Sequence, residues 1–261
     1  MREPPAPTPS PMRVLVTGGG TTAPIDDVRH LANASTGRFS AAITEAWLER
    51  GASVWHLCAP NAERPFHRDA PWWNLDRDPD ELHRRLDEAL RRYRAHRDRL
   101  TLLPLAENTV AGYARALERT LLDPGGIDVI VLAMAASDYE PALTPGKISS
   151  EADELLLRCR KAPKVIRGVR DRAPGAYIVG FKLLSGASEA ELIQAAEDSC
   201  RVNRVDLTVA NDLRRYRAGR HTIHLVRPGH PVETYGPADG DLAAILVDRV
   251  SSWAGLPGRQ E

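Results

Sequence analysis

Short apolar runs alternate with helical hydrophobic patterns along most of this chain. Each run is short enough for a buried strand, and the segments between the runs repeat apolar residues at helical spacing. The runs lie at 14–16, 53–57, 100–104, 128–134, 177–180 and 207–210, with a weaker one at 155–158. The helical patterns lie at 38–50, 79–99, 109–122, 189–203 and 239–253. This alternation predicts an α/β fold with a mainly parallel sheet and crossover helices.

A β-hairpin is predicted near the C-terminus, where the alternation stops. Residues 222–226 and 232–235 are strand-like, and the turn residues Pro228 and Gly229 lie between them. An isolated two-stranded ribbon is barely stable in water. We therefore expect this hairpin to pack against its symmetry mate at the interface of a homodimer.

The chain is predicted to form one domain. The domain spans 13–254, a Pro-rich tail at 1–12 is expected to be disordered, and residues 255–261 are expected to be flexible. Residues 61–80 are predicted to form a surface excursion, in which Trp72 and Trp73 either anchor the loop to the core or stack on a base. The arginines of the 79–99 helix are predicted to form a solvated face.

Composition and charge exclude several classes of protein. The chain has 261 residues with 43% hydrophobic content, enough for one large α/β core or two small ones. Its 35 basic and 35 acidic residues cancel, so no net field selects nucleic acid or an anionic membrane. No apolar run approaches the ~18 residues of a membrane span, and the first residues lack the apolar region of a signal peptide. Three distant cysteines without a C-x-x-C motif indicate neither disulfides nor zinc. We therefore expect a cytoplasmic protein without a metal site built by the protein.

Two loops with many accessible backbone N–H groups form the first candidate site. A glycine run at 18–20 follows the first strand, and the segment 33–37 (NASTG) precedes the first helix, where Ser and Thr are natural N-caps. Such loops suit a polyphosphate. The pattern Gly18-x-Gly20-x-x-Ala23 also matches the dinucleotide fingerprint, although the helix is delayed and the next strand lacks the expected acid. NAD(P) binding and a tight turn without a ligand both stay open.

The carboxyl ends of the later strands supply further candidates, because ligands of open parallel sheets lie there. The fourth strand leads into Ala135 and Ala136, which are small enough for close approach of a substrate. Asp138 follows them and is placed either to meet a ligand or to serve as a cap or turn residue. The fifth strand is predicted to deliver Phe181 and Lys182 to the same edge.

Seven motifs occur in order between residues 13 and 250: GGT, VRHLANASTGR, AASDY, GK, KAPK, GFKL and VAND. Together they resemble phosphopantothenate–cysteine ligase, the amide-forming enzyme of coenzyme A biosynthesis. The FKL form and the absence of a preceding flavin decarboxylase domain resemble the stand-alone type. The resemblance implies a Rossmann-like, doubly wound fold, a homodimer, and CTP or ATP used with Mg²⁺. It implies nucleotidyl transfer to the carboxylate of 4′-phosphopantothenate, followed by attack of the amine of L-cysteine.

The resemblance also implies roles for individual residues. The positions that match nucleotide contacts are Gly19, Ser35, Gly37, Phe181 and Asn211. The positions that match the phosphopantothenate site are Asn33, Ala135, Ala136 and Asp138, together with Arg29, which is expected to come from the other subunit. Lys147 matches the lysine of a mobile flap, although an ordinary solvated lysine remains an alternative. We expect Asn33, Lys147 and Asp138 to be catalytic, with Asn33 donating to the acyl oxygen unless it only caps the following turn.

The chain departs from the family pattern at three places. The basic run of the flap keeps only its first lysine, and residues 199–203 lack the lysines that some members have before VAND. Lys182 and the arginines of the 189–203 helix are expected to compensate. Ser40 stands where many members have glycine, which should tighten the phosphate loop.

Two other classes of function stay open. One is a nucleotide-dependent ligase that joins a different acid or amine. The other is a nucleotide-binding or NAD(P)-binding protein without catalysis. The sequence does not choose between CTP and ATP.

Overall fold

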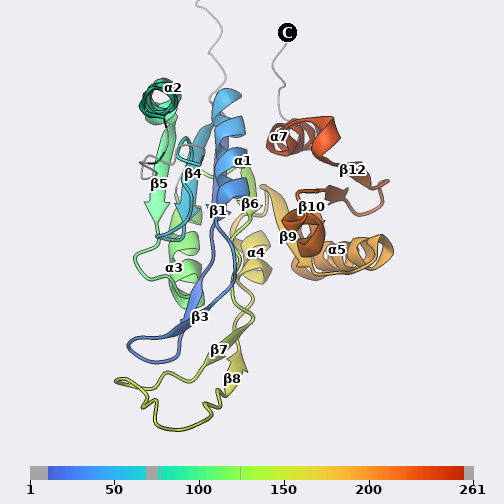
Figure 1. Cartoon of the computed structure of the whole chain (residues 1–261). Coiled ribbons are helices and arrows are strands. Elements are labelled where there is room, and N and C mark those ends of the chain that lie inside the picture. Colours follow the sequence, from blue (N-terminus) through green and yellow to red (C-terminus); the bar gives the residue numbers. More distant parts are fainter. Residues whose placement is uncertain (1–10, 69–75, 77, 124, 256–261) are drawn as a thin grey trace, which may run out of the picture.

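The computed structural model describes residues 11–68, 76, 78–123 and 125–255. Its centre is an eight-stranded sheet in the order β12-β11-β10-β9-β6-β1-β4-β5 (Figure 1). Six adjacent strands of this sheet run parallel to one another: β1 (Arg13–Gly18), β4 (Ser53–Cys58), β5 (Leu100–Pro104), β6 (Val129–Leu132), β9 (Tyr177–Leu184) and β10 (Leu207–Asp212). The parallel sheet predicted from the apolar runs is confirmed.

Two layers of helices cover the sheet. On one face lie α1 (Arg38–Glu49) and α7 (Leu242–Trp253), whose buried side chains pack with Val14 and Val16 of β1. On the other face α3 (Val110–Leu121), the 3₁₀ turn η2 (Val165–Gly168) and α4 (Val169–Arg172) pack with Leu15 of β1, and α5 (Glu189–Asn203) joins them there. Successive residues of a strand point to opposite faces, so each inner strand must be apolar throughout. The doubly wound fold is confirmed.

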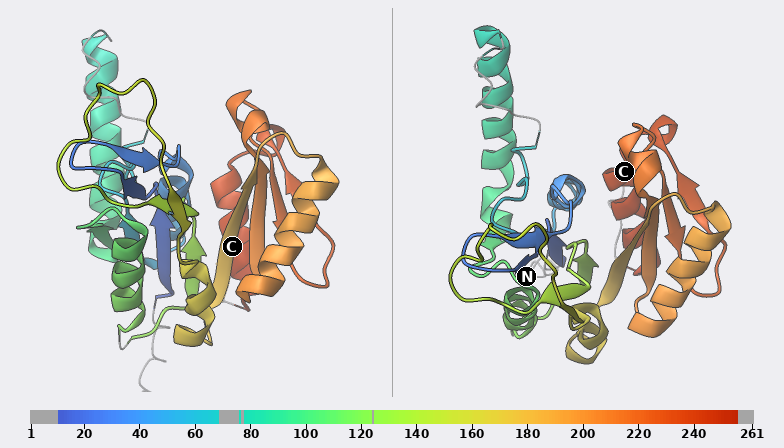
Figure 2. Two further views of the ribbon diagram at one scale, coloured as in Figure 1. Left: turned by 90° about the horizontal axis from the view of Figure 1, so that it is seen from below. Right: turned by 60° about the horizontal axis from the view of Figure 1, so that its bottom comes forward.

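The helix α2 (Pro79–His96) stands out from the β5 edge of the sheet and buries none of its residues (Figure 2). It ends in the 3₁₀ turn η1 (Arg97–Arg99). The predicted solvated face is confirmed for most of this helix. Arg92 differs, because its guanidinium reaches back to Glu45 and Glu49 of α1 at 2.9 Å from each.

The predicted C-terminal hairpin is present as β11 (Ile223–Val226) and β12 (Glu233–Tyr235), followed by the 3₁₀ turn η3 (Pro237–Asp239). β11 pairs antiparallel with β10, so the hairpin extends the main sheet. The reasoning that an isolated ribbon needs a symmetry mate is therefore wrong for this hairpin. The homodimer itself stays a prediction.

Five short elements were absent from the sequence prediction. They are β2 (Thr22–Pro24) paired with β3 (His30–Ala32), β7 (Tyr139–Pro141) paired with β8 (Cys159–Lys161), and α6 (Leu213–Arg217). The strands β3, β7 and β8 extend below the sheet in Figure 1. The weak strand expected at 155–158 is wrong, because the residues that pair with β7 are 159–161.

β9 is longer than its apolar run. It pairs with β6 through Gly180 and continues along β10 to Leu184. Phe181 and Lys182 therefore lie within the strand, not after it.

The two predicted tails fall largely on residues 1–10 and 256–261, and Trp72 and Trp73 fall in 69–75, all outside the described residues. None of the helices in the described part of the chain is both long and apolar enough to cross a bilayer.

Candidate active site

The glycine run after β1 and the residues before α1 lie against each other. Gly19 and Gly37 have φ angles of +88° and +78°, a region that favours glycine. A Cβ on Gly37 would lie 3.3 Å from the backbone nitrogen of Gly19 and 2.8 Å from the Cβ of Ala62. A Cβ on Gly20 would lie 2.9 Å from the carbonyl oxygen of Asn33. The two predicted loops therefore form one surface. They approach each other so closely that only glycine fits at positions 20 and 37.

The first turn of α1 is open to an anion. Its N-cap is Gly37, which supplies no side-chain cap, so the prediction that Ser or Thr caps this helix is wrong. The hydroxyl of Thr36 accepts a hydrogen bond from the N–H of Arg38 at 3.2 Å, and the first turn contains no acidic residue. Backbone N–H groups without an intrahelical partner and the positive end of the helix dipole favour a bound negative charge.

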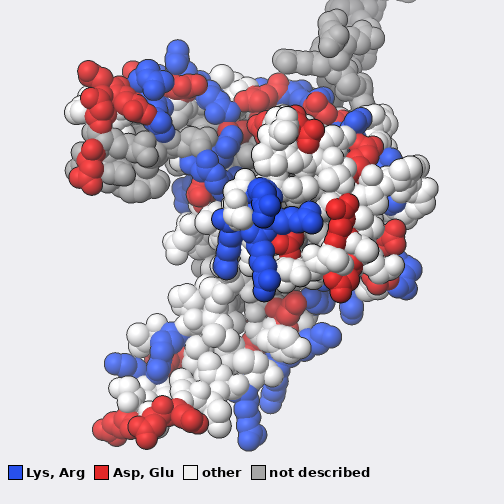
Figure 3. All heavy atoms as spheres, turned by 45° about the vertical axis from the view of Figure 1, so that its right-hand side comes forward, with Lys and Arg blue, Asp and Glu red and all other residues white. Residues whose placement is uncertain are grey.

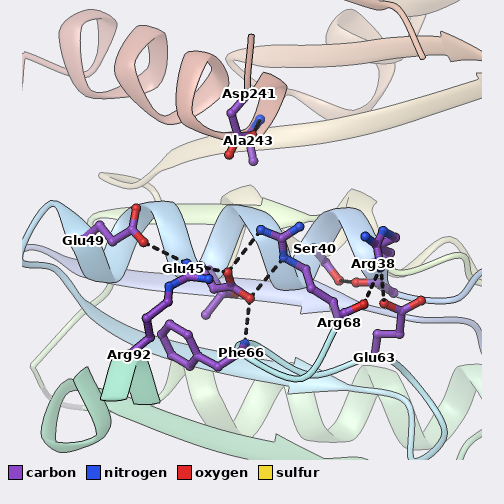
Figure 4. Close-up of polar contacts among 12 residues, drawn as sticks. Arg38, Ser40, Glu45, Glu49, Glu63, Phe66, Arg68, Arg92, Asp241 and Ala243 are labelled. Atoms are coloured by element: carbon purple, nitrogen blue, oxygen red, sulfur yellow. Dashed lines mark hydrogen bonds and ion pairs between the residues drawn. The ribbon is translucent and has the colours of Figure 1, made fainter. Parts of the chain in front are cut away.

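Ser40 tightens this loop as expected. Its hydroxyl donates to the carbonyl oxygen of Gly37 at 2.7 Å, and it fills the space where a Cβ on Gly18 would lie 1.8 Å from its Oγ. Figure 4 shows Ser40 and, further along α1, the buried carboxylate of Glu45. Glu45 accepts from the N–H of Phe66 at 2.6 Å and from the guanidinium of Arg68 at 3.1 Å. These contacts hold the segment after β4 beside the start of α1.

The loop after β6 is linked to the loop after β1. Gly20 and Ala135 form a parallel bridge, and the N–H of Ala135 donates to the carbonyl oxygen of Gly19 at 2.8 Å. The N–H of Thr21 returns a bond to the carbonyl oxygen of Ala135 at 3.2 Å. β1 and β6 are the neighbours at which the strand order reverses, and ligands of open α/β sheets bind at this point.

Asn33 connects the two loops through its side chain. Its Nδ2 donates to the carbonyl oxygen of Ala136 at 3.1 Å and makes a longer contact of 3.4 Å with that of Ala135. The atom that accepts from the N–H of Ser35 is the main-chain oxygen of Asn33, at 2.9 Å. The alternative in which the Asn33 side chain only caps the turn is therefore wrong.

Asp138 is paired with Lys164, which was not among the predicted site residues. Its carboxylate forms an ion pair with the ammonium of Lys164, and its carbonyl oxygen accepts from Ala162 at 2.9 Å. Lys164 comes from the KAPK motif, which the resemblance included without assigning it a role. The pairing brings the ammonium group of Lys164 to the loop that follows β6.

Arg29 and the segment that carries Lys147 lie together at the turn between β2 and β3. Arg29 follows the β2–β3 turn and donates to Asp26 of its own chain and to the carbonyl oxygen of Ile148 at 2.7 Å. Lys147 is exposed beside Ile148. Arg29 is thus held within its own chain, and its expected contact with the site of another subunit stays a prediction.

Phe181 and Asn211 face α1, whereas Lys182 faces the other way. The ring of Phe181 lies 6.2 Å from that of Phe39 in the first turn of α1. Asn211 shares this face, because Leu207 and Val209 on the same strand pack with α1 and α7. Lys182 is the next residue after Phe181 and points to the opposite face, so it does not compensate at the α1 side.

The expected compensation by the arginines of the 189–203 helix is wrong. Arg201 is in the last turn of α5 and pairs with Asp198 at 2.8 Å. That turn leads to Asp206, whose carboxylate accepts from Ile178 at the beginning of β9. Arg201 therefore lies at the amino edge of the sheet, opposite to the glycine loops.

α6 and the turn after it bring arginines to the carboxyl edge instead. The helix begins directly after β10 and carries Arg214, Arg215 and Arg217, with Arg220 following. His221 lies 4.9 Å from the ring of Phe39, so this segment contacts the beginning of α1. Figure 3 shows a dense group of Lys and Arg side chains near the middle of the face on this side of the molecule.

Among the residues that the structure describes, no group of three or more His, Cys, Asp and Glu side chains could hold a metal ion. The loops offer N–H and hydroxyl groups in place of carboxylates. These donors suit phosphate oxygens, and magnesium held by the phosphates and water stays a prediction.

The glycine loops, the reversal point and the Asn33 bridge coincide with a known domain. The chain matches the model of the DNA/pantothenate metabolism flavoprotein C-terminal domain over residues 10–70 and 110–251. It belongs to this family. The matched residues include both glycine loops and the segment from β6 to α7.

Curated relatives of the family have related names. A phosphopantothenate–cysteine ligase of Oryza sativa subsp. japonica is 32% identical over 224 residues, which are 78% of this chain and 69% of that protein. The human phosphopantothenate–cysteine ligase is 32% identical over 226 residues, covering 77% of this chain and 72% of that protein. The coenzyme A biosynthesis bifunctional protein of Thermococcus kodakarensis is 30% identical over 91% of this chain, but the match spans only 50% of that relative.

Solved structures share the fold. A DNA/pantothenate metabolism flavoprotein of Streptococcus pneumoniae superposes with a TM-score of 0.72 at 25% identity, covering 93% of this chain and 99% of the other. A Cab2 mutant in complex with phosphopantothenate-cysteine gives a TM-score of 0.79 at 23% identity, covering 94% and 86%.

Proposed function

We propose that this protein joins 4′-phosphopantothenate to L-cysteine in coenzyme A biosynthesis, with a nucleoside triphosphate as the energy source. The observation that supports this most is the hydrogen bonding of the Asn33 side chain. It joins the two loops at 18–20 and 33–37 to the small residues Ala135 and Ala136. An anion site and a site for a second substrate thus meet at one point. The names of the relatives identify phosphopantothenate as the acid and cysteine as the amine.

The chemistry requires two steps with a shared intermediate. A carboxylate of the acid attacks the α-phosphorus of the nucleotide and displaces pyrophosphate, giving an acyl-nucleotide. The amine of cysteine then displaces the nucleoside monophosphate and forms the amide. Both steps develop negative charge, and fixed donors matched to that charge are usually the largest catalytic contribution.

The residues of this chain divide these tasks by position. The N–H groups of Gly19 and of the first turn of α1 bind the phosphates, with Ser35 beside them. Phe181 and Asn211 line the same face and contact the nucleoside. Asn33 donates to the acyl oxygen, and Asp138 with Lys164 orients the acid. Magnesium, when bound to the phosphates, neutralises part of their charge.

A homodimer is proposed through a different surface from the one expected. Seven large apolar side chains are exposed on the β2–β3 and β7–β8 region and its connecting loop: Val28, Leu31, Tyr139, Leu143, Leu155, Leu156 and Leu157. Exposed apolar side chains that cluster in this way are typical of protein interfaces. A second copy that covers them would lie next to Arg29, which then is close enough to contact the partner.

The test is pyrophosphate release with CTP or ATP, magnesium and phosphopantothenate, followed by addition of cysteine. We expect release with one nucleotide and amide formation only after cysteine is added. Gly37→Val is the control, because its φ of +78° and the 2.8 Å approach to Ala62 exclude a side chain. Pyrophosphate release that requires an acid other than phosphopantothenate would show that the substrate is a different acid. Binding of NAD(P)H without any pyrophosphate release would refute the proposal.

A further inference from the structure

Lys147 projects from a backbone that is clamped on both sides. The peptide groups of Gly146 and Ile148 each make two hydrogen bonds to the β2–β3 turn. The resemblance implies a mobile flap at this position, and in this structure its backbone is hydrogen-bonded on both sides of Lys147.

The clamp on Gly146 is made by Asp27 alone. The carboxylate of Asp27 accepts from the N–H of Gly146 at 3.1 Å. The N–H of Asp27 donates to the carbonyl oxygen of Gly146 at 3.0 Å. The N–H of Thr144 adds a bond to the carbonyl oxygen of Ile25 at 2.9 Å. The segment before Lys147 therefore runs beside the turn and is joined to it by backbone hydrogen bonds.

The clamp on Ile148 is made by Asp26 and Arg29 together. The carboxylate of Asp26 accepts from the N–H of Ile148 at 3.0 Å, and the guanidinium of Arg29 donates to the carbonyl oxygen of Ile148 at 2.7 Å. Asp26 is only 4% exposed, although it is charged. It also accepts from the N–H groups of Val28 and Arg29 at 2.9 and 2.7 Å and from the Arg29 side chain.

A buried carboxylate of this kind is stable only when its partners are in place. The bond from the Arg29 side chain, with support from the backbone N–H groups, holds the pKa of Asp26 well below its usual range. Its charge is therefore kept at any pH at which the enzyme is assayed. Protonation of Asp26 therefore does not weaken the clamp in this pH range.

We propose that Asp26 and Asp27 are positioning residues, which fix the backbone on both sides of Lys147 so that its ammonium is presented to the phosphates in one orientation. This inference rests on the proposed function, together with the role of flap lysine that the family resemblance implies for Lys147. A lysine acts as a point charge on a flexible stem, so the place where the stem begins decides where the charge can reach. When the backbone at Lys147 is already fixed, less conformational entropy is lost as its ammonium binds the phosphates.

The first test is digestion of the full chain with a lysine-specific endopeptidase. The chain contains only four lysines, at 147, 161, 164 and 182, so few bonds compete. In Asp27→Ala, cleavage after Lys147 should accelerate about fivefold to tenfold, as expected for one lost hydrogen bond. Cleavage after Lys161 serves as the internal reference. Asp27→Asn retains an oxygen acceptor for Gly146 and should restore the slow rate.

The second test is a double-mutant cycle on turnover. Asp27→Ala should lower kcat about tenfold when Lys147 is present and should have no further effect in Lys147→Ala, because the clamp acts through this lysine. A residue with a merely structural role would lower kcat equally in both backgrounds. Sedimentation of each variant separates a loss of association from a loss of positioning.

The outcomes distinguish the two proposals. Equal losses in both backgrounds, or unchanged cleavage after Lys147, would overturn the clamp while leaving the ligase proposal intact. A wild-type protein that releases no pyrophosphate would refute the ligase proposal, and the digestion would still decide whether Asp27 holds the backbone.

Discussion

Asn33→Asp is the substitution that separates the two chemical steps most directly. The side chain of Asn33 acts as a donor, with one short contact to Ala136 and one longer contact to Ala135. An ionised carboxylate of the same size can only accept. It would face two carbonyl oxygens at hydrogen-bond distance and would have no proton to offer to either of them, or to an acyl oxygen.

The magnitude follows from these contacts. When a hydrogen-bond donor is removed and its acceptor finds no other partner, the cost in free energy is about 1–3 kcal/mol. The 3.1 Å contact is an ordinary hydrogen bond and the 3.4 Å contact is a weak one. The second N–H is therefore the one available to the acyl oxygen. With repulsion between the new charge and the two carbonyl dipoles, we expect about 2–3 kcal/mol to be lost from the transition state of acyl transfer, or roughly 30- to 150-fold in rate.

The nucleotide should still bind, because its proposed donors are the N–H groups of Gly19 and of the first turn of α1. The assay is a quenched single turnover with labelled nucleotide, in which Asn33→Asp should release pyrophosphate and accumulate the acyl-nucleotide. Asn33→Ala is the control, since it removes the donor without adding a charge and should show a smaller effect of the same kind. Product formed at the wild-type rate with no intermediate would refute the reasoning.

Four further predictions follow from the same structure. Lys147→Ala should lower turnover at least tenfold without changing the unfolding midpoint, whereas near wild-type turnover would show an ordinary solvated lysine. Leu156, which is 87% exposed, should lie in the dimer interface, so Leu156→Glu should shift sedimentation toward the monomer. Replacing both Arg214 and Arg217 with Glu should weaken nucleotide binding about tenfold or more, and calorimetry that shows no change would exclude α6 from the site. Burial, with a smaller contribution from Arg64, lowers the pKa of His56 from 6.5 to about 4. The free energy of unfolding should therefore fall by up to about 3 kcal/mol as pH decreases from 6.5 toward 4. Denaturant titrations at each pH measure this dependence, and His56→Gln should flatten it.

The sign of the His56 effect follows from which state binds the proton. The unfolded chain takes up a proton near pH 6.5, while the folded chain resists it, because the ring is buried and the positive charge of Arg64 opposes a second one. Acid therefore favours the unfolded state across this window. Above pH 6.5 both states are neutral at this position and the contribution is constant.

The parallel sheet could be predicted because its strands are buried on both faces. Such strands are continuous apolar runs, and the helices between them carry a separate period. The three-residue strands β2, β3, β7 and β8 could not be predicted in this way, because a segment this short has no measurable period. Every residue of β3 and β8 is also exposed to solvent, so no buried hydrophobic pattern marks these strands.

The site could be predicted as far as backbone chemistry decides it. Glycines at 18–20 and 37 indicate close approach of the main chain, and alanines at 135 and 136 indicate space. Side-chain pairings could not be predicted, because they join residues that are distant in sequence. Asn33 meets Ala136 across 103 positions, and Asp26 meets Ile148 across 122 positions. Only the paths of the intervening loops decide such contacts.

In the proposed homodimer, the position of Lys147 would link catalysis to association. The segment that carries Lys147 connects β7 to β8, and the same connection presents Leu143 and Leu156 to solvent. The β2–β3 turn that clamps this segment presents Val28 beside Arg29. A second copy packed on these apolar side chains would press the connection onto the turn and exclude water from the hydrogen bonds of the clamp. Hydrogen bonds to charged groups strengthen when water is excluded. Dimer formation and the orientation of Lys147 would then support each other, so Leu156→Glu should also lower turnover at protein concentrations at which the wild-type protein is dimeric.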